Sequence, residues 1–234
     1  LTWFTDMKID GKDVYPKLHD KLKESGFDKK EPISKQLYDI YGLYPAPGDR
    51  HVGEFFPYYM KEEVLMEQDY EWKNNDFKVV DGWREEARVL FDEVRTKKEG
   101  YEEFLKGSGE TATYFIRSLA TGDISDEMVN VINNGYIDNV SSGIIVELPT
   151  YIDEFGLHPQ KIGKLPDAIA AQCDRLGREY LLMVEAAATC NYELARQAMF
   201  LDPLVSNCKY PELLLKDLIR ANLDLLPEAW EKHC

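Results

Sequence analysis

The segment from Gly48 to Tyr59, GDRHVGEFFPYY, places four polar side chains of complementary chemistry close together: Asp49, Arg50, His51 and Glu54. A carboxylate, a guanidinium and an imidazole side by side can accept a proton and bind hydroxyls or anions. The segment then turns aromatic, which favours burial. We interpret it as the wall of an active site. The alternative is a surface helix that begins near His51, is capped by Asp49, and in which Arg50 pairs with Glu54.

The residues before this segment are of types that hold a loop in one place. Residues 34–41, SKQLYDIY, have a helical pattern, which Gly42 is expected to end. The sequence PAPG at residues 45–48 then predicts a rigid, non-helical approach to Asp49. A loop stiffened by two prolines can keep a functional carboxylate in a fixed position.

Composition and charge exclude several classes of function. The 234 residues carry a formal net charge of −15 and have a pI near 4.7, with no basic stripe, which argues against binding to nucleic acid or to an anionic membrane. No apolar run reaches the roughly 18 residues of a membrane span. The four cysteines and four histidines have no metal-ligand spacing. Scattered thiols fit a reducing compartment, so we expect a cytoplasmic protein without a metal site of its own.

Turn residues and periodicity predict mostly helices in the first two thirds of the chain. Two short extended pieces flank DGKD at residues 10–13, and a helix that Gly26 ends follows them. The charged stretch 64–107 predicts a surface helix. Ser108 is a candidate cap for a further helix that ends at Gly122. The strongest strand signal of the chain is GIIVELPTYID, residues 143–153.

The last third of the chain predicts three helices. Asn191 is the expected cap of the second helix, and LDPL at residues 201–204 is expected to end it. The third helix is expected to run from Pro211 to a point before Pro227. The Met and Leu positions of these helices are expected in the core, and the first helix carries the stripe Ile169, Cys173, Leu176, Tyr180, Met183 and Ala187. We therefore predict a single α+β domain over residues 1–234, mostly helical, with a small mixed or antiparallel sheet.

Several short motifs follow one another in the order of a known family. They are LTWF, with Trp3 as the last position of an NHxxW motif, then GDRHVGEFFPYY, NNGYIDN, VELPTYID, Leu165-Pro166, VEAAATCNYELARQAMFLDPL and LLPEAW. Over essentially the whole chain these motifs resemble the C-terminal domain of family-4 glycoside hydrolases, the NAD- and manganese-dependent glycosidases. The resemblance implies a lactate/malate dehydrogenase-like C-terminal domain. It also implies a Rossmann NAD domain upstream, which this segment lacks.

The resemblance implies an unusual reaction for a glycosidase. The sugar is oxidised at C3 by NAD, deprotonated at C2, and cleaved at C1 by elimination, while Mn²⁺ polarises the C2 and C3 oxygens. The metal-binding Cys of the family lies upstream, and its metal-binding His would directly precede Leu1. We therefore expect this segment to be cut from a larger protein, to lack the ligands of NAD and Mn²⁺, and to be inactive alone.

The same resemblance assigns roles to residues of the polar segment. Asp49 is the candidate general base, or a carboxylate that supports it. Tyr44 and Tyr41 are the alternatives, because family members that act on phosphorylated sugars use a tyrosine base. GDRH is similar to the branch that cleaves unphosphorylated α-galactosides, α-glucosides and uronides, and Arg50 suits the carboxylate of a uronide. The candidate substrate contacts are Arg50, His51, Glu54 and Asn134.

Other interpretations of these residues stay open. Asn133, Asn134 and Asn139 suit a turn as well as a cleft, Trp3 suits burial more than sugar stacking, and Arg84 suits a solvated helix. The expected partner is a small carbohydrate, and the Leu-rich C-terminus with the family analogy favours a homodimer or homotetramer. The alternatives to a glycosidase are a non-enzymatic helical interaction domain and the C-terminal domain of a lactate/malate dehydrogenase-like oxidoreductase.

Overall fold

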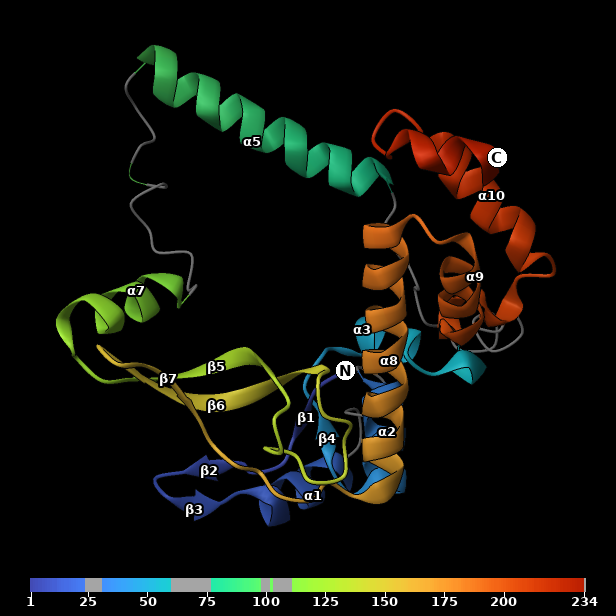
Figure 1. Cartoon of the computed structure of the whole chain (residues 1–234). Coiled ribbons are helices and arrows are strands. Elements are labelled where there is room, and N and C mark those ends of the chain that lie inside the picture. The colour runs from blue at the N-terminus through green and yellow to red at the C-terminus, as the bar shows by residue number, and fades with distance from the viewer. Residues whose placement is uncertain (24–30, 60–76, 98–101, 103–110, 234) are drawn as a thin grey trace. The chain divides into compact units, whose positions relative to one another are not determined.

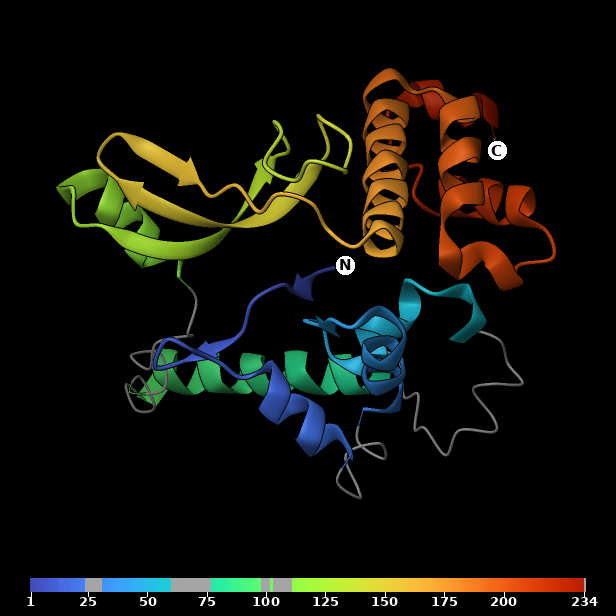
Figure 2. The same cartoon turned by 90° about the horizontal axis from the view of Figure 1, so that it is seen from below.

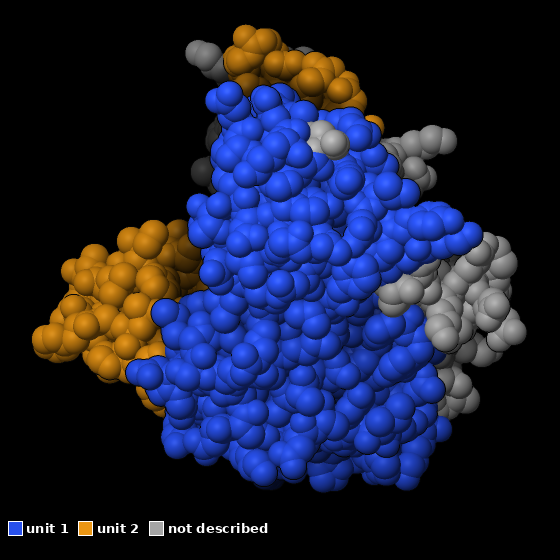
Figure 3. Space-filling model, turned by 45° about the vertical axis from the view of Figure 1, so that its right-hand side comes forward, with its two compact units in different colours: residues 1–70, 130–148, 160–234 blue, residues 71–129, 149–159 orange. Residues whose placement is uncertain are grey.

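The computed structural model describes residues 1–23, 31–59, 77–97, 102 and 111–233 (Figure 1). Contacts within the chain divide it into two compact units, which Figure 3 shows in different colours. Unit 1 comprises residues 1–70, 130–148 and 160–234, and unit 2 comprises residues 71–129 and 149–159. Whether residues 1–234 behave as one domain stays a prediction. No helix in the described part of the chain has the length and apolarity to cross a membrane.

The chain of unit 1 begins with two small antiparallel pairs. Strands β2 (Lys8–Ile9) and β3 (Lys12–Asp13) form a hairpin. Its turn residues Asp10 and Gly11 have φ of 50° and 72°, as a two-residue hairpin turn requires. This confirms the turn predicted at DGKD. The helix predicted next is α1 (Tyr15–Lys23), and its expected end at Gly26 lies outside the described residues.

The polar segment 48–59 forms a short helix and a 3-10 helix, and it follows a longer helix and a second small sheet along the chain. Strand β1 (Trp3–Phe4) pairs antiparallel with β4 (Tyr44–Pro45). Helix α2 (Pro32–Tyr41) ends at Gly42 with φ of 74°, as predicted. Helix α3 (Asp49–Glu54) and the 3-10 helix η1 (Pro57–Tyr59) follow. The apolar core beneath them is fully buried and consists of Ile33, Leu37, Val52 and Phe56.

The C-terminal helices of unit 1 are α8 (Asp167–Thr189), α9 (Tyr192–Leu201), η2 (Pro203–Asn207), α10 (Pro211–Ala221) and η3 (Glu228–His233). Helices α8 and α9 lie side by side in both views (Figures 1 and 2). The Asn191 side chain accepts hydrogen bonds from the amides of Glu193 and Leu194, which confirms the predicted cap. Trp230 joins Leu215 and Ile219 in a small core of its own.

The predicted apolar stripe of α8 is only half right. Ile169 and Leu176 are buried, but Tyr180 is 51% exposed, Met183 is 49% exposed, and Ala187 is exposed. The expectation that the Met and Leu positions of these helices are core is therefore wrong for Met183, as it is for several leucines of α10. Small and polar side chains explain the difference, because the buried positions of α8 other than Ile169 and Leu176 are occupied by Ala170, Glu179 and Ala186.

The remaining strands form a three-stranded sheet in the order β5 (Ser125–Ile132), β6 (Ile145–Asp153), β7 (Gly156–Pro159). Strands β6 and β7 pair antiparallel through a tight hairpin, and β6 is the strand predicted from GIIVELPTYID. Unit 2 comprises β7, parts of β5 and β6, α5 (Phe77–Lys97) and α7 (Ala112–Thr121), which ends at Gly122 with φ of 76° as expected. The predicted cap Ser108 is outside the described residues. Helices with small antiparallel sheets confirm the α+β class.

Candidate functional site

Asp49 is the best-anchored residue of the polar segment. It is only 4% exposed, and its two carboxylate oxygens accept hydrogen bonds from the backbone amides of Ile33 and Ser34, each at 2.8 Å. These amides are in the first turn of α2, whose own N-cap Glu31 makes no side-chain cap bond. The amides of a first turn lack intrahelical partners and carry partial positive charge. Asp49 therefore closes the N-terminus of α2 from 15 to 16 residues further along the chain.

This placement corrects one detail of the helix-cap interpretation. Helix α3 begins at Asp49, and its N-cap is Gly48, whose φ of −62° and ψ of 159° are extended. Asp49 is therefore not the cap of a helix near His51 but the remote cap of α2. The two hydrogen bonds of Asp49 attach the first residue of α3 to the N-terminus of α2 and so restrict the direction in which α3 leaves the loop.

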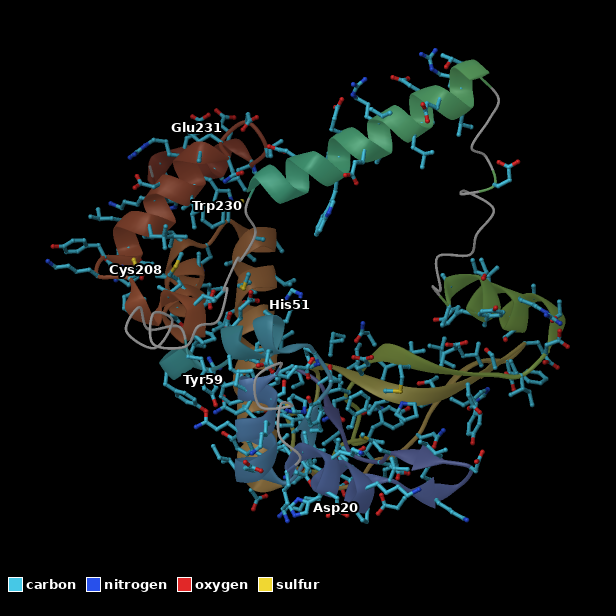
Figure 4. All side chains as sticks on the ribbon, turned by 180° about the vertical axis from the view of Figure 1, so that it is seen from behind. Asp20, His51, Tyr59, Cys208, Trp230 and Glu231 are labelled. Carbon is cyan, nitrogen blue, oxygen red and sulfur yellow. The ribbon has the colours of Figure 1, made fainter. Side chains whose placement is uncertain are left out.

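His51 and Glu54 are the accessible polar groups of α3. The exposed fraction is 63% for the His51 side chain and 27% for the Glu54 side chain, and Nδ1 of His51 lies 3.8 Å from Oε2 of Glu54. Figure 4 labels His51. Both residues are one turn apart on the same helix, so they share a face. The side chain of Arg50 is outside the described part of the structure, so its predicted pairing with Glu54 or with a substrate carboxylate stays a prediction.

The proline loop before α3 is fixed by the first strand. The amide of Ala46 donates to the carbonyl of Thr2 at 2.9 Å, and Trp3 pairs with Pro45. The Trp3 ring is buried and packs edge-on against Tyr41, with 5.4 Å between centroids. Trp3 is therefore a core residue of this loop, in agreement with the expectation of burial.

The two tyrosines proposed as alternative bases have different surroundings. Tyr44 donates its hydroxyl to Oε2 of Glu31 at 2.5 Å, and burial, reinforced by the Glu31 carboxylate, raises the pKa of Tyr44 well above its ordinary value. A phenol held in its protonated form is a poor proton acceptor near neutral pH. Tyr41 packs between Trp3 and Phe56. The environment of Tyr44 does not favour a role as a base, and the role of Tyr41 stays a prediction.

The asparagines of the turn after β5 divide into structural and free positions. Asn133 is fully buried, donates to the carbonyls of Ile137 and Val140, and accepts from the amide of Ile137. Asn139 exchanges two hydrogen bonds with the backbone of Leu165. Both therefore fold the loop. Asn134 is exposed, which leaves its side chain available to a ligand and its role a prediction.

Sequence analysis did not single out Arg175, a half-buried residue of α8 that donates to the carbonyl of Phe55 directly after α3. The sequence signal that could have pointed to Arg175 is its position between Cys173 and Leu176, two residues of the apolar stripe predicted for this helix. Arg84, in contrast, is a solvated residue of α5 as expected, since its side chain is 76% exposed and only approaches Asp81.

The described residues do not make a cofactor site by themselves. Among them, no group of three or more His, Cys, Asp or Glu side chains is arranged to hold a metal ion. The sequence also has no glycine-rich loop between a strand and a helix of the kind that binds the pyrophosphate of NAD. The described residues therefore provide no metal site of this kind, and the sequence provides no NAD-binding loop of this kind.

Comparison with known proteins identifies the family. Residues 1–205 match the model of the family 4 glycosyl hydrolase C-terminal domain, so the chain belongs to this family. It is 29% identical to an α-galactosidase of Bacillus subtilis over 97% of this chain and 54% of the relative. It is 30% identical to an α-galacturonidase of Thermoanaerobacterium saccharolyticum over 99% of this chain and 53% of the relative. The chain thus spans about half the length of these relatives.

Solved structures agree with this assignment. A 6-phospho-α-glucosidase from gut microorganisms, solved with NAD and glucose-6-phosphate, has a TM-score of 0.76 at 26% identity, over 97% of this chain and 52% of that one. A 6-phospho-β-glucosidase from Thermotoga maritima, solved with manganese, NAD⁺ and glucose-6-phosphate, has a TM-score of 0.68 at 25% identity, over 93% and 51%. Membership of this family favours the glycosidase over the interaction domain and over the dehydrogenase-like alternative.

Proposed function

We propose that this chain is the substrate-binding part of a glycosidase that cleaves an α-O-glycosidic bond in an unphosphorylated sugar or uronide. The observation that carries the proposal is the arrangement of α3, in which buried Asp49 locks the helix onto α2 while His51 and Glu54 stay accessible on it. The relatives named α-galactosidase and α-galacturonidase support this substrate class.

In this proposal the accessible residues of α3 bind the sugar. The imidazole of His51 and the carboxylate of Glu54 are 3.8 Å apart and can accept and donate hydrogen bonds to neighbouring hydroxyls. Arg50 is the residue we expect to meet a uronide carboxylate, because a guanidinium binds it through two parallel hydrogen bonds. Asn134 is a further candidate contact. A face that is pre-oriented in this way lowers the entropic cost of placing the sugar.

Asp49 remains the candidate base, or the carboxylate that supports it, and the geometry favours the supporting role. Each of its oxygens accepts one amide and keeps a second lone pair, but the residue is almost entirely buried. Tyr44 is the weaker candidate because the pKa of its phenol is raised by burial and by Glu31. A proton acceptor must reach the substrate, and the side chains of His51 and Glu54 are more accessible than that of Asp49.

We further propose that the whole enzyme uses NAD and Mn²⁺, as the structures of family members solved with these groups suggest. NAD would supply hydride transfer and Mn²⁺ would polarise sugar oxygens. Because the described residues do not form a site for either group, we expect their ligands in parts of the enzyme outside this segment. The isolated segment is then inactive, and the complete protein is a homodimer or homotetramer in the cytoplasm.

The test is a hydrolysis assay of the full-length protein on p-nitrophenyl α-galactoside, α-glucoside, α-galacturonide and α-glucuronide. A parallel panel of 6-phosphorylated glycosides covers the substrate class named for other relatives. We expect release from an unphosphorylated substrate that stops when either NAD⁺ or Mn²⁺ is omitted. Release only from phosphorylated sugars would overturn the substrate class. Full activity without NAD⁺, or no release from any glycoside, would overturn the proposed reaction.

A further inference from the structure

Arg175 connects two helix ends of unit 1 that are far apart in sequence. Its Nη1 donates to the carbonyl of Leu201 at 2.7 Å, and its Nη2 donates to the carbonyl of Phe55 at 3.2 Å. A third, longer bond at 3.4 Å reaches the side-chain oxygen of Gln172 on the same helix. Phe55 is the C-cap of α3, and Leu201 is the last residue of α9, where LDPL stops the helix. One side chain therefore bridges the C-terminal ends of α3 and α9.

Guanidinium is well suited to this position. The last carbonyls of a helix have no intrahelical donor and carry partial negative charge, which a nearby cation stabilises. The planar fork of arginine can serve two acceptors at once, whereas a lysine ammonium is a single, strongly hydrated centre. The hydrogen bonds that the structure gives Arg175 go to two carbonyls and an amide oxygen, not to a carboxylate. The charge of Arg175 thus stabilises the carbonyls at the C-terminal ends of α3 and α9.

The acidic groups near Arg175 do not compete for it. Glu179, one turn further along α8, is buried and its Oε2 has no partner, and burial, with Asp202 adding to the effect, raises its pKa to about 7. The side chain of Asp202 accepts from the amide of Leu204 and so belongs to η2. Neither acid accepts one of the hydrogen bonds described for Arg175, whose guanidinium is bonded to the carbonyls of Phe55 and Leu201.

Helix α3 is too short to hold its own position. It has six residues, fewer than an isolated helix needs to persist in water. Its first residue, Asp49, is bonded to the amides of α2, and the carbonyl that follows its last residue is bonded to Arg175. The two anchors lie at opposite ends of the helix. Loss of either removes one of the two hydrogen-bonded anchors and leaves the orientation of α3 to the other anchor and to the packing of buried Val52.

We propose that Arg175 is a positioning residue for the sugar-binding face of α3. It acts through the Phe55 carbonyl and orients His51 and Glu54 without touching the substrate. The inference rests on the proposed function for its catalytic consequence, but the anchoring of α3 is a property of the chain that can be measured without activity.

The experiment compares Arg175→Met and Arg175→Lys with Arg178→Met in the full-length enzyme. Arg178 is on the same helix, and its Nε pairs with Asp174 at 2.7 Å without contacting α3 or α9 in the bonds shown, so it is a matched control. Below the unfolding temperature of every variant, we expect Arg175→Met to lower kcat/KM about 100-fold, the effect of a small misplacement of a binding group. We expect Arg175→Lys to recover part of the lost kcat/KM, and the kcat/KM of Arg178→Met to stay within about twofold of the wild-type value.

Amide hydrogen exchange of residues 50–56 is the readout that needs no activity. We expect exchange there to accelerate at least about fivefold in Arg175→Met, while the middle of α8 keeps the wild-type rate. Wild-type kcat/KM in this variant, or a fall in activity without faster exchange in α3, would overturn the positioning role. If the wild type hydrolyses no glycoside, the proposed function fails, and exchange alone decides whether Arg175 anchors α3. If Arg175→Met does not fold, the lysine variant carries the same comparison.

Discussion

Helices α3 and α5 show two opposite ways of making a helix from a polar sequence. Helix α3 has six residues and is fixed through contacts with other elements, namely the α2 amides that bind Asp49 and the Arg175 side chain at its other end. Helix α5 has 21 residues and carries ion pairs between its own side chains, such as Arg88 with Glu85 and Asp92. The first is positioned by the fold, and the second is supported locally.

The difference indicates where a substrate site can be built. A binding group must be held in one orientation, which requires anchors with locked partners rather than exposed pairs. In α5, Trp83 is 62% exposed and Phe91 is 60% exposed, and the charges of Arg88 and Asp92 are largely solvated. In α3, by contrast, the accessible groups rest on a buried, doubly bonded carboxylate. We therefore place the sugar-binding face on α3.

Removing the Asp49 carboxylate, which anchors α3 to α2, is expected to have the largest effect on stability. Asp49→Ala leaves the buried amides of Ile33 and Ser34 without acceptors, which costs about 3 kcal/mol of unfolding free energy. Urea unfolding of the segment measures it, with Asp39→Ala as the control, because Asp39 is on α2 but pairs with Lys35 at the surface. A loss no greater than that of the control would show that Asp49 does not anchor α2.

Glu179, the buried acid one turn from Arg175 on α8, is expected to have a smaller, pH-dependent effect on the free energy of unfolding. Burial raises the pKa of Glu179 from its ordinary value near 4.5 to about 7, with Asp202 raising it further and Arg175 opposing the shift. The folded state then binds more protons than the unfolded state, so the contribution of Glu179 to stability is complete below about pH 4.5 and is lost as pH rises towards 7.

The variant Glu179→Gln removes this titration. We expect the difference in unfolding free energy between Glu179→Gln and the wild type to change by about 2 kcal/mol between pH 5 and pH 7.5, in favour of the variant at the higher pH. Urea titrations at a series of pH values measure it. A difference that is constant over this range would contradict the raised pKa of Glu179.

The smallest effect is expected in α5. Arg88→Ala removes a guanidinium that pairs with Glu85 and Asp92 on the solvated surface, where such pairs contribute little. The urea midpoint of this variant is expected to equal that of the wild type within experimental error. A clear fall in the midpoint would show that α5 depends on its charge network, and it would weaken the contrast with α3.

Local signals in the sequence were enough to predict the elements but not the anchors. The end of α2 at Gly42 and the cap at Asn191 follow from residue types that act within a few positions, as does the strand β6. The bond from Asp49 to α2 spans 15 to 16 residues, and the bond from Arg175 to Phe55 spans 120. Contacts at such separations are created by the fold, so sequence patterns identified Asp49 but not its partners.

The apolar stripe of α8 failed for a related reason. Tyr180 and Met183 have the right spacing for a core face, yet they are exposed, because the buried side of the helix continues from Ile169 and Leu176 through Ala170, Glu179 and Ala186. Hydrophobic periodicity measures side-chain type and not the direction in which a neighbouring helix packs. Two alanines and a buried acid give almost no periodic signal, although they mark the inner face.

The most direct test of the sugar-binding face is the kcat/KM of His51→Ala in the full-length enzyme, measured together with its unfolding midpoint. His51 is accessible and is not an anchor of α3, so we predict that kcat/KM on the preferred glycoside falls at least about 100-fold while the midpoint stays at the wild-type value. Wild-type kcat/KM in His51→Ala would show that the accessible face of α3 does not meet the substrate, and it would contradict the placement of the site.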